Sequence, residues 1–513
     1  MRKSVLLSIP AVASAATNVS FPAVPTNPPA DASQVLDRRL ASLSIEFAYL
    51  PTFAGNKTHP NRLTGEIMKR IVERTGLGPD IRVGGNTIDS SVFDANAPAL
   101  NLTLSDSLKI YRTTYGPAYF ESFHIFPDTS RFILNANLKN DSVEIAQKEI
   151  EAGFKYLGKD RIYSILLGNE PDLYQRSEWT SAAYTAKFLN WTSTLTKALK
   201  LPPRIFQVCA FAKIPKSTAP MTTVSAINDG IDKTGVVKLF DQHTYPYSTC
   251  TPESDAQATL ESLLNHTGIM AYWDQWKLQI ATARSLGKEF VMGEYGSASC
   301  SGKQNVSDTF GQAMWLADVI LYGASLNISR MYLHQGATLI GSAANQVNGP
   351  GLSWYDLWYP IASERYGAAC VSPSFVAYLL VTEAVGSSGQ SRLALIRDVL
   401  FPPSLVVYAI WDPSARKDGV ARAVVLNMAI RLEDSGTNEA DTVVVDVTRW
   451  ATNAKGIEVK RMSAPGVNSK DVEKVMWAGQ SYTDGVPAGK LSVEKSKTGL
   501  VSVKASEGVL VMF

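Results

Sequence analysis

The sequence predicts an α/β chain, a (β/α)8 TIM barrel with an appended C-terminal β-sandwich domain. Between about residues 41 and 387, eight short apolar runs alternate with longer stretches of helical periodicity, which is the pattern of a barrel. After about residue 388 the long helical stretches stop. Short β-rich runs separated by turn residues then continue to residue 513, which is typical of a β-sandwich.

The eight apolar runs are nearly continuous, which favours strands buried on both faces of a parallel sheet. They cover residues 44–50, 81–85, 131–138, 163–170, 205–211, 239–246, 289–296 and 330–336. Between them, apolar residues at 3.6-residue spacing predict helices over 61–75, 142–157, 180–199, 271–286 and 306–326. An open doubly wound sheet is the alternative, but Gly76-x-Gly78 precedes a strand instead of following one, so it is no dinucleotide fingerprint.

The remaining segments complete the predicted domain organisation. Residues 1–15 combine a basic start, a short apolar stretch and an Ala13-Ser14-Ala15 cleavage site, so we expect a signal peptide and a secreted chain. Residues 16–40 contain a Pro-rich extended stretch, which we expect to join the β-sandwich of residues 388–513. The barrel then occupies 41–387. In the sandwich, β-rich runs cover 393–396, 405–411, 423–429, 442–447, 456–461, 491–493, 500–503 and 509–513.

Sequons and cysteines agree with secretion. Eight N-x-S/T sequons predict N-linked glycans, at Asn18, Asn56, Asn101, Asn140, Asn190, Asn265, Asn305 and Asn327. The chain has four cysteines, Cys209, Cys250, Cys300 and Cys370, and three pairings are open. One or two disulfides are expected, with Cys209 a candidate buried thiol because it lies in an apolar strand.

Composition limits the partners. With 49 Lys plus Arg against 47 Asp plus Glu, the net charge is only +2, and no basic run is present, so nucleic acid is not expected as a partner. No later run of 18 apolar residues predicts a membrane span. No Cys or His spacing is typical of zinc, and no cofactor motif is present, so neither a metal nor a cofactor is expected.

Two carboxylates stand where a barrel builds its active site. Glu170 ends the fourth strand within Asn169-Glu170-Pro171, and Glu294 ends the seventh. Each follows an apolar run, and burial in such surroundings keeps a carboxyl group protonated near neutral pH. A pair of this kind performs glycosidic cleavage, in which one carboxyl protonates the leaving oxygen and the other attacks the anomeric carbon. A structural salt bridge at Glu294 and a pre-proline strand end at Glu170 are the alternatives.

These motifs resemble those of the retaining glycoside hydrolases with catalytic residues on strands 4 and 7. The chain is similar to glycoside hydrolase family 79, and to its fungal β-glucuronidase branch, which is related to heparanase. The resemblance rests on Asn169-Glu170-Pro171, on Glu294, and on three further segments, namely Arg82–Asn86, His243-Thr244-Tyr245 and the small-residue loop 297–302. It covers nearly the whole mature chain.

The resemblance implies a secreted exo-β-glucuronidase acting by double displacement. Glu170 is then the acid/base, Glu294 the nucleophile, Asn169 a ligand of the sugar 2-hydroxyl, and Tyr245 a donor to the nucleophile. Backbone N–H groups of the loop that includes Ser301 and Gly302 are implied to bind the sugar carboxylate. Tyrosine partners for that carboxylate cannot be chosen among Tyr355, Tyr359 and Tyr366.

Other strand ends supply further candidates. Glu46 and Gln335 close strands 1 and 8, and Asn86 follows strand 2; we expect them to bind sugar hydroxyls, with structural roles as the alternative. Arg82 needs a buried partner, and Glu294 or Glu46 is expected. His243 and His334 end strands 6 and 8, where a structural role is the more common one.

Three rival functions remain open. A neutral-sugar β-glycosidase, such as a β-glucosidase or β-xylosidase, would use the same barrel and the same two carboxylates. A heparanase-like endo-enzyme would need a basic cleft, which the net charge of +2 does not favour. A non-catalytic secreted carbohydrate-binding protein would not need both Glu170 and Glu294.

Overall fold

The computed structural model describes residues 16–104, 110–174, 179–216, 221–337, 351–435, 441–452, 454 and 456–513. The expected signal peptide, residues 1–15, lies outside the described residues. Within these ranges, no helix has the length and the apolar character needed to span a membrane.

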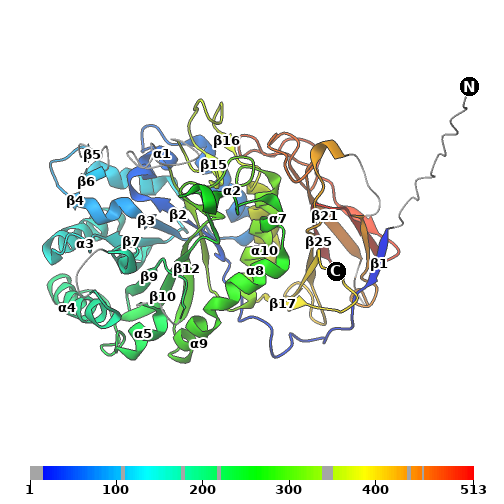
Figure 1. The fold of residues 1–513 in the computed structure, drawn as a ribbon, viewed down its shortest axis with the longest axis horizontal. Coiled ribbons are helices and arrows are strands. Elements are labelled where there is room, and N and C mark those ends of the chain that lie inside the picture. The colour runs from blue at the N-terminus through cyan, green and yellow to red at the C-terminus, as the bar shows by residue number, and fades with distance from the viewer. Residues whose placement is uncertain are drawn as a thin grey trace, which may run out of the picture.

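Eight parallel strands form a closed barrel, which confirms the predicted fold class (Figure 1). In chain order they are β2 (Ala41–Glu46), β3 (Ile81–Gly84), β7 (Phe132–Ala136), β8 (Ile162–Leu167), β9 (Phe206–Phe211), β10 (Val237–Thr244), β12 (Glu289–Tyr295) and β14 (Met331–Gln335). A small apolar cluster includes residues from six of these strands, namely Ile133, Leu166, Ala210, Leu239, Val291 and Tyr332. The barrel therefore has a packed core and no open channel.

Helical elements follow the strands and surround the barrel. They are α2 (Arg62–Thr75), the 3₁₀ segment η3 (Pro117–Ile125), α3 (Val143–Leu157), α4 (Ser181–Leu199), α5 (Thr223–Asn228), α8 (His266–Trp273), α9 (Lys277–Ser285), α10 (Phe310–Ser325) and α11 (Phe375–Val385). Polar side chains begin several of them. Asn61, Ser142 and Thr180 accept hydrogen bonds from the first turns of α2, α3 and α4.

Shorter elements lie in the loops between these strands and helices. They are α1 (Leu50–Ala54), β4 (Ser91–Phe93), β5 (Leu100–Leu104), β6 (Ile110–Tyr115), β11 (Tyr247–Ser248), α6 (Pro252–Asp255), α7 (Leu260–Leu263), β13 (Ala298–Ser299), β15 (Trp358–Tyr359) and β16 (Cys370–Val371). Strands β4, β6 and β5 form a small sheet, while β11 pairs with β13 and β15 with β16.

The helices differ from the sequence prediction in several places, since η3, α5 and α11 were not predicted and one predicted helix is divided. The helix expected over 271–286 is divided by a 3₁₀ turn at Asp274–Trp276, which allows both Trp273 and Trp276 to be buried on one side. The helix α11 was not predicted, because ten of its eleven residues are buried and its nearly continuous apolar sequence shows no 3.6-residue stripe. It packs against α2, α10 and strands of the C-terminal domain.

Two sheets form the C-terminal domain. The larger contains β17 (Arg392–Ile396), β18 (Leu405–Trp411), β19 (Arg422–Asn427), β25 (Glu507–Met512), β21 (Ile457–Ser463), β22 (Met476–Trp477) and β23 (Glu494–Ser496). The smaller contains β1 (Thr17–Ser20), β20 (Val443–Asp446) and β24 (Leu500–Val503). Apolar residues of both sheets share one core, which confirms the sandwich. The run expected over 491–493 is displaced to β23.

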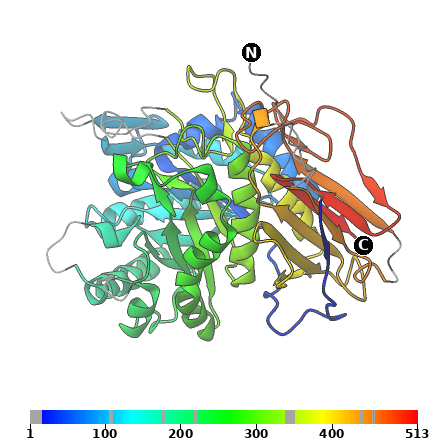
Figure 2. The ribbon, with the colours of Figure 1, turned by 45° about the vertical axis from the view of Figure 1, so that its right-hand side comes forward.

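The N-terminal segment belongs structurally to this sandwich. Strand β1 pairs in parallel with β20, and Val19 and Phe21 enter the sandwich core. Trp450 Nε1 donates to the Pro22 carbonyl (2.8 Å), and Ser33 N–H donates to the Leu393 carbonyl (2.7 Å). Figure 2 shows this dark-blue segment passing along the sandwich before the chain enters the barrel. The two ends of the chain thus stabilise one domain.

Candidate active site

The end of β8 is irregular, and this places both Asn169 and Glu170 at the barrel mouth. Strict alternation would direct adjacent side chains to opposite sides of a strand. Here the strand ends at Leu167, and Gly168 (φ +79°) and Glu170 (φ +49°) adopt left-handed conformations. A Cβ on Gly168 would lie 2.5 Å from the Tyr174 hydroxyl, so this turn requires glycine.

A second irregularity brings His243 beside Glu294. The register of β10 on β12 shifts so that Gln242 pairs with Met292 and His243 pairs with Glu294. The skipped residue, Gly293, donates its N–H to Asp241 Oδ1 (2.7 Å), and a Cβ there would lie 2.2 Å from that oxygen. Such bulges often redirect side chains at active sites.

Glu294 is held as a carboxylate by its neighbours. Arg82 Nη1 donates to Oε2 (2.5 Å), as expected for the buried arginine, and the Tyr245 hydroxyl donates to Oε1 (2.8 Å). Burial favours the neutral form, but attraction to His334, His243 and Arg82 and the Tyr245 hydrogen bond outweigh it. The pKa of Glu294 therefore lies far below its usual range.

The pKa of Glu170 is shifted in the opposite direction, above its usual value. Burial is the main cause that raises its pKa, and the negative charge of Glu294 adds to the effect. A hydrogen bond between His243 Nδ1 and Oε1 (3.2 Å) opposes this shift only in part. One carboxyl is therefore kept ionised and the other is biased toward its protonated form, which assigns opposite chemical tasks to the pair.

His243 connects the two carboxyl groups. Its Nδ1 lies 3.2 Å from Glu170 and 3.9 Å from Glu294 Oε2, and its Nε2 lies 3.8 Å from Asp241. Burial and the Arg82 charge lower the pKa of His243, but Glu294, Asp241 and Glu170 together raise it to about 9. The imidazole is therefore a cation at neutral pH.

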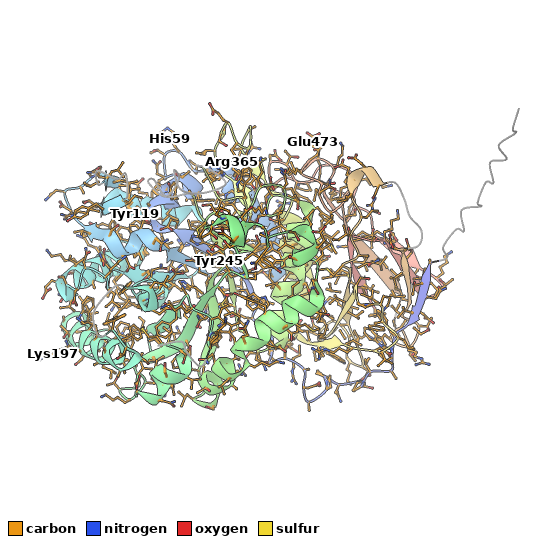
Figure 3. The ribbon with its side chains drawn as sticks, in the orientation of Figure 1. His59, Tyr119, Lys197, Tyr245, Arg365 and Glu473 are labelled. Atoms are coloured by element: carbon orange, nitrogen blue, oxygen red, sulfur yellow. A yellow bond between two sulfur atoms is a disulfide. The ribbon has the colours of Figure 1, made fainter. Side chains whose placement is uncertain are left out.

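A cavity of about 470 Å³ opens over these groups. Figure 3 shows Tyr245 near the middle of the molecule, among the barrel elements. The wall is formed by Glu46, Asn86, Glu170, Leu173, Ala212, Tyr245, Cys250, Glu294, Ser299, Cys300, Ser301, His334, Ala337 and Tyr355. Six of the predicted site residues are on it, namely Glu46, Asn86, Glu170, Tyr245, Glu294 and Ser301.

Asn169 lies beneath this wall and is buried. Its Oδ1 accepts from Arg82 Nη2 (2.5 Å), and its Nδ2 donates to Asn86 Oδ1 (3.3 Å). In this arrangement it joins Arg82 to Asn86. Contact with a sugar 2-hydroxyl stays a prediction.

Two predicted substrate ligands are corrected. Gln335 is fully buried, donates to the His334 carbonyl (2.8 Å) and accepts from Leu357 N–H (2.7 Å), so it supports the backbone and does not line the cavity. The Gly302 N–H donates to the Ala298 carbonyl (3.0 Å), so this donor is already used within its turn. Strand position alone could not reveal either bond.

Several wall residues were not assigned by the sequence. His334 lies 3.7 Å from both Glu294 and Glu46, although its strand-end position was the only signal. Tyr355 lines the cavity, whereas the rings of Tyr359 and Tyr366 stack on each other and their hydroxyls donate to backbone carbonyls. Cys250 and Cys300 form a disulfide in the wall, and Cys209 is a buried thiol.

The same site contains residue types that bind metals, but the positive charges around them do not favour a metal ion. Glu170, His243 and Glu294 offer ligand atoms within 4.8 Å of one another. However, His243 carries a proton at neutral pH, and Arg82 donates to Glu294. A metal needs deprotonated ligands and would be repelled by both cations, so these residues fit proton transfer better.

Known proteins resemble this chain over nearly its whole length. Residues 407–510 match the domain family described as "Glycosyl hydrolase family 79 C-terminal beta domain". A β-glucuronidase of Aspergillus niger is 28% identical over 94% of this chain and 90% of its own length. A β-glucuronidase of Neurospora crassa is 27% identical over 93% of this chain and 89% of its own length.

Solved structures show the same fold. A 4-O-α-L-rhamnosyl-β-D-glucuronidase from Fusarium oxysporum superposes with a TM-score of 0.78, at 20% identity, over 96% of this chain and 100% of that chain. A family 51 α-L-arabinofuranosidase from Bifidobacterium longum gives 0.58 at 11% identity, over 97% of this chain and 99% of that chain. Taken with the sandwich match and the near full-length relatives, this identifies the chain as a glycoside hydrolase that is similar to the members of glycoside hydrolase family 79.

Proposed function

We propose that the chain is a secreted retaining exo-β-glucuronidase. The observation that carries the mechanism is the carboxyl pair at the ends of β8 and β12, whose pKa values are displaced in opposite directions. Ligand oxygens of Glu170 and Glu294 lie within 4.8 Å of each other. Retaining glycosidases place their carboxyl groups about 5–5.5 Å apart, whereas inverting enzymes leave about 6.5–9.5 Å for a water molecule.

The first half of the reaction forms a covalent sugar ester. Glu294 attacks the anomeric carbon while Glu170 gives its proton to the departing glycosidic oxygen. Arg82 and Tyr245 hold the Glu294 oxygens in fixed positions before attack, so little reorganisation is needed. Once the ester forms, the negative charge on Glu294 is lost, and the pKa of Glu170 falls.

The second half releases the sugar. Glu170, now ionised, takes a proton from water, which attacks the anomeric carbon; the bond from that carbon to the Glu294 oxygen breaks, and Glu294 is restored as a carboxylate. The cation on His243 stays beside both groups and favours the ionised form of Glu170 at this stage. The anomeric configuration is inverted twice and is therefore retained.

Glucuronic acid is the sugar that we assign, because both near full-length relatives are β-glucuronidases. Tyr355 on the cavity wall is our candidate donor to the sugar carboxylate. Burial raises the pKa of its hydroxyl well above the usual range, so it stays a neutral donor. Ser301 on the neighbouring loop supplies further polar contact.

Secretion and glycosylation belong to the same proposal. Seven of the eight sequon asparagines are exposed, and only Asn327 is half-buried, where it accepts from Gln34 N–H (2.6 Å). The Cys250–Cys300 disulfide is typical of an oxidising compartment. A loss of mass on enzymatic removal of N-glycans from natively produced protein, with an N-terminus near residue 16, is the expected result.

Initial rates on a panel of aryl β-glycosides test the activity. With one aryl leaving group, the glucuronide should be hydrolysed much faster than the glucoside, galactoside or xyloside. Proton NMR of the first product should show the β-anomer. Preference for a neutral sugar would overturn the glucuronidase assignment but keep the mechanism. An α-anomer as first product would overturn retention.

A further inference from the structure

The cavity wall has a polar half and an apolar half. The polar half comes from β14, β2 and β3, which are neighbours in the barrel, and carries His334, Glu46 and Asn86. Contacts join these residues to the nucleophile, because His334 lies 3.7 Å from both Glu294 and Glu46, and Asn86 N–H donates to Glu46 (3.3 Å). This half suits the hydroxyl groups of the sugar that Glu294 attacks.

The apolar half comes from the three strands β8, β9 and β10, which are also neighbours. It carries Leu173, Ala212 and Cys250, and the disulfide joins Cys250 to Cys300 in the loop after β12. Glu170 itself follows β8 and protonates the oxygen that joins the sugar to its leaving group. The leaving group must therefore lie on this side of the cavity, beyond Glu170.

Leu173 exposes an apolar side chain at the cavity. It is 49% exposed, and among the large exposed apolar residues within the described ranges it is the one that lines this cavity. It follows Glu170 by three positions, and its N–H donates to the Glu170 carbonyl (2.9 Å). Any group bonded to the oxygen that Glu170 protonates is therefore brought close to this side chain.

The loop that carries Leu173 is fixed before a ligand arrives. The Asp172 carboxylate accepts from the N–H groups of Ala212 (2.9 Å) and Lys213 (2.8 Å), which joins the loops after β8 and β9. On the other side, the Thr249 hydroxyl donates to the Cys300 carbonyl (2.9 Å) next to the disulfide. A surface that is already ordered loses little entropy when it binds.

The chemistry of this half does not suit a second sugar. A sugar has several hydroxyl groups that lose hydrogen bonds to water on binding, and each needs a replacement. Leu173, Ala212 and the two sulfur atoms offer none. Ser299, whose hydroxyl lies 3.7 Å from Cys250 Sγ, provides one nearby.

We propose that Leu173, Ala212 and the Cys250–Cys300 disulfide form a leaving-group subsite that takes an apolar aglycone, such as an alkyl or aryl alcohol, in preference to a second sugar. The proposal rests on the proposed glucuronidase function and names the class of glucuronide that the enzyme cleaves. Binding of the apolar group removes the exposed Leu173 surface from water, which favours the transition state as well as the bound substrate.

The test compares two glucuronides with chemically similar leaving groups. n-Hexyl β-D-glucuronide and glucuronosyl-β-1,6-galactose both release a primary alcohol, so they make similar demands on Glu170. Wild type should give at least a tenfold higher kcat/KM for the hexyl glucuronide. Equal use of the disaccharide, or preference for it, would overturn the subsite.

Variants locate the preference at the proposed surface. Leu173→Ala should lower kcat/KM for the hexyl glucuronide about tenfold and change the disaccharide less than about twofold. Leu173→Gln, of similar size, should move the preference toward the disaccharide. Leu278→Ala, which removes a 65% exposed leucine on α9 outside the cavity, is the matched control and should change neither. Equal losses on both substrates in Leu173→Ala would contradict the assignment.

The outcomes separate this inference from the function on which it rests. If an aryl β-glucuronide is hydrolysed but the hexyl and galactosyl glucuronides are used equally, the glucuronidase function holds and the subsite is wrong. If no glucuronide is hydrolysed while a neutral glycoside is, the proposed function itself is wrong.

Discussion

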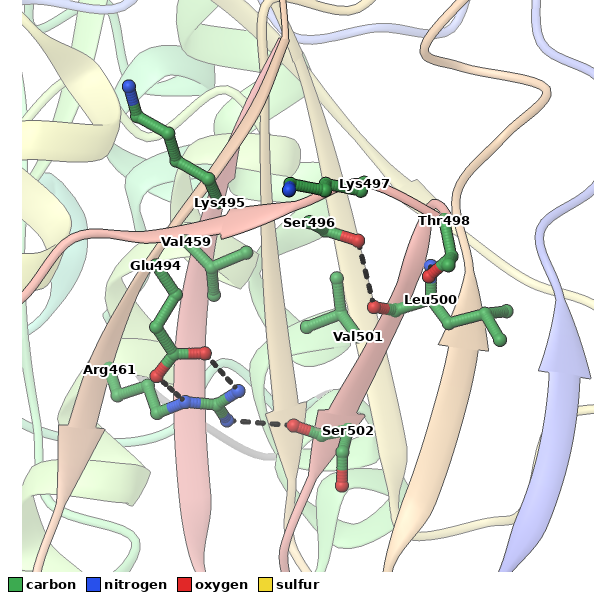
Figure 4. A pocket seen from close by; sticks show the side chains of 10 residues that line it. All are labelled: Val459, Arg461, Glu494, Lys495, Ser496, Lys497, Thr498, Leu500, Val501 and Ser502. Atoms are coloured by element: carbon green, nitrogen blue, oxygen red, sulfur yellow. Dashed lines mark hydrogen bonds and ion pairs between the residues drawn. The ribbon is translucent and has the colours of Figure 1, made fainter.

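Two hollows in this molecule have similar volumes and contain charged residues, but only one is built for chemistry. The catalytic cavity of about 470 Å³ lies at the ends of the barrel strands. The other, of about 410 Å³, lies on the sandwich beside β21, β23 and β24 and contains Arg461, Glu494, Lys495 and Lys497 (Figure 4).

In the sandwich hollow, Arg461 and Glu494 form an ion pair. Arg461 Nε and Nη2 donate to the two oxygens of Glu494 (2.6 and 2.8 Å), and Nη1 donates to the Ser502 carbonyl (2.7 Å) and to Glu507 (3.0 Å). The hydrogen bond from Arg461 keeps the pKa of Glu494 below its usual value. This carboxylate is a simple anion with a full set of partners.

In the catalytic cavity the two carboxyl groups differ in their tendency to ionise. Arg82 and Tyr245 stabilise Glu294 as an anion, while burial and that anion bias Glu170 toward its neutral form. The difference teaches that a cluster of charged groups becomes reactive when the pKa values of its members are shifted in opposite directions and the groups face an open cavity. Fully paired groups, by contrast, are structural.

The largest effect should come from removing the nucleophile. Glu294→Gln keeps the shape of the side chain but cannot form the sugar ester, so kcat should fall by about 10⁵-fold. Steady-state rates on an aryl β-glucuronide measure this, and the melting temperature shows whether the fold survives. Glu494→Gln removes a carboxylate from the other hollow and is the matched control. A residual rate within about 100-fold of wild type would rule out Glu294 as the nucleophile.

The second largest effect should come from removing the acid, and its size should depend on the leaving group. Glu170→Ala should lower kcat/KM about 10²–10⁴-fold for alkyl glucuronides, which need a proton on the departing oxygen. Activated aryl glucuronides need little acid assistance, so the loss in kcat/KM should be far smaller for them. The slope of log kcat/KM against the pKa of the leaving alcohol reports this difference. An equal loss across the series would argue against Glu170 as the acid.

His243 should set the pH range of activity. At neutral pH its cation lowers the pKa of both Glu170 and Glu294, so His243→Asn should raise both pKa values. In a plot of kcat/KM against pH, both the acidic limb and the basic limb should therefore move to higher pH. A side chain with only a packing role would lower the rate without moving either limb.

The charge on His243 should also appear in stability. Its pKa is raised from 6.5 to about 9 in the folded chain, so its contribution to the free energy of unfolding is complete below about pH 6.5 and is lost as pH rises through 9. Chemical denaturation of wild type and His243→Asn across pH 6–10 measures this term. Parallel curves for the two proteins would contradict the raised pKa.

The smallest effect should come from the sandwich hollow. Arg461→Met leaves activity unchanged and lowers the free energy of unfolding by about 1 kcal/mol or less, because the pair with Glu494 is partly exposed. Denaturation and rates on the aryl glucuronide check both parts. A large loss of activity would mean that the sandwich contributes to catalysis, and the contrast between the hollows would fail.

The sequence was sufficient to predict those features that depend on a local pattern of residues. All eight barrel strands, the position of both carboxylates on the cavity wall and the Arg82 partner were predicted, because apolar runs and strand ends are visible in the chain itself. The first strand, expected over 44–50, ends at Glu46 because Phe47–Tyr49 is helical. Gln335 also stands at a strand end, but its amide faces the Leu357 backbone, and no spacing in the sequence records that. Helix α11 was missed for a related reason, since it is buried on all sides and lacks a stripe.

The sequence by itself determined the barrel, the sandwich and the position of Glu170 and Glu294 at the barrel mouth, because these depend on hydrophobic periodicity and on residues next to each other in the chain. Only the tertiary structure decided in which direction the pKa of each carboxyl group is shifted, that Cys250 pairs with Cys300, and that Leu173 lines the cavity. These properties depend on distances between loops of different strands. Their physical causes are burial, Coulomb attraction and contact, which act through space and not along the chain.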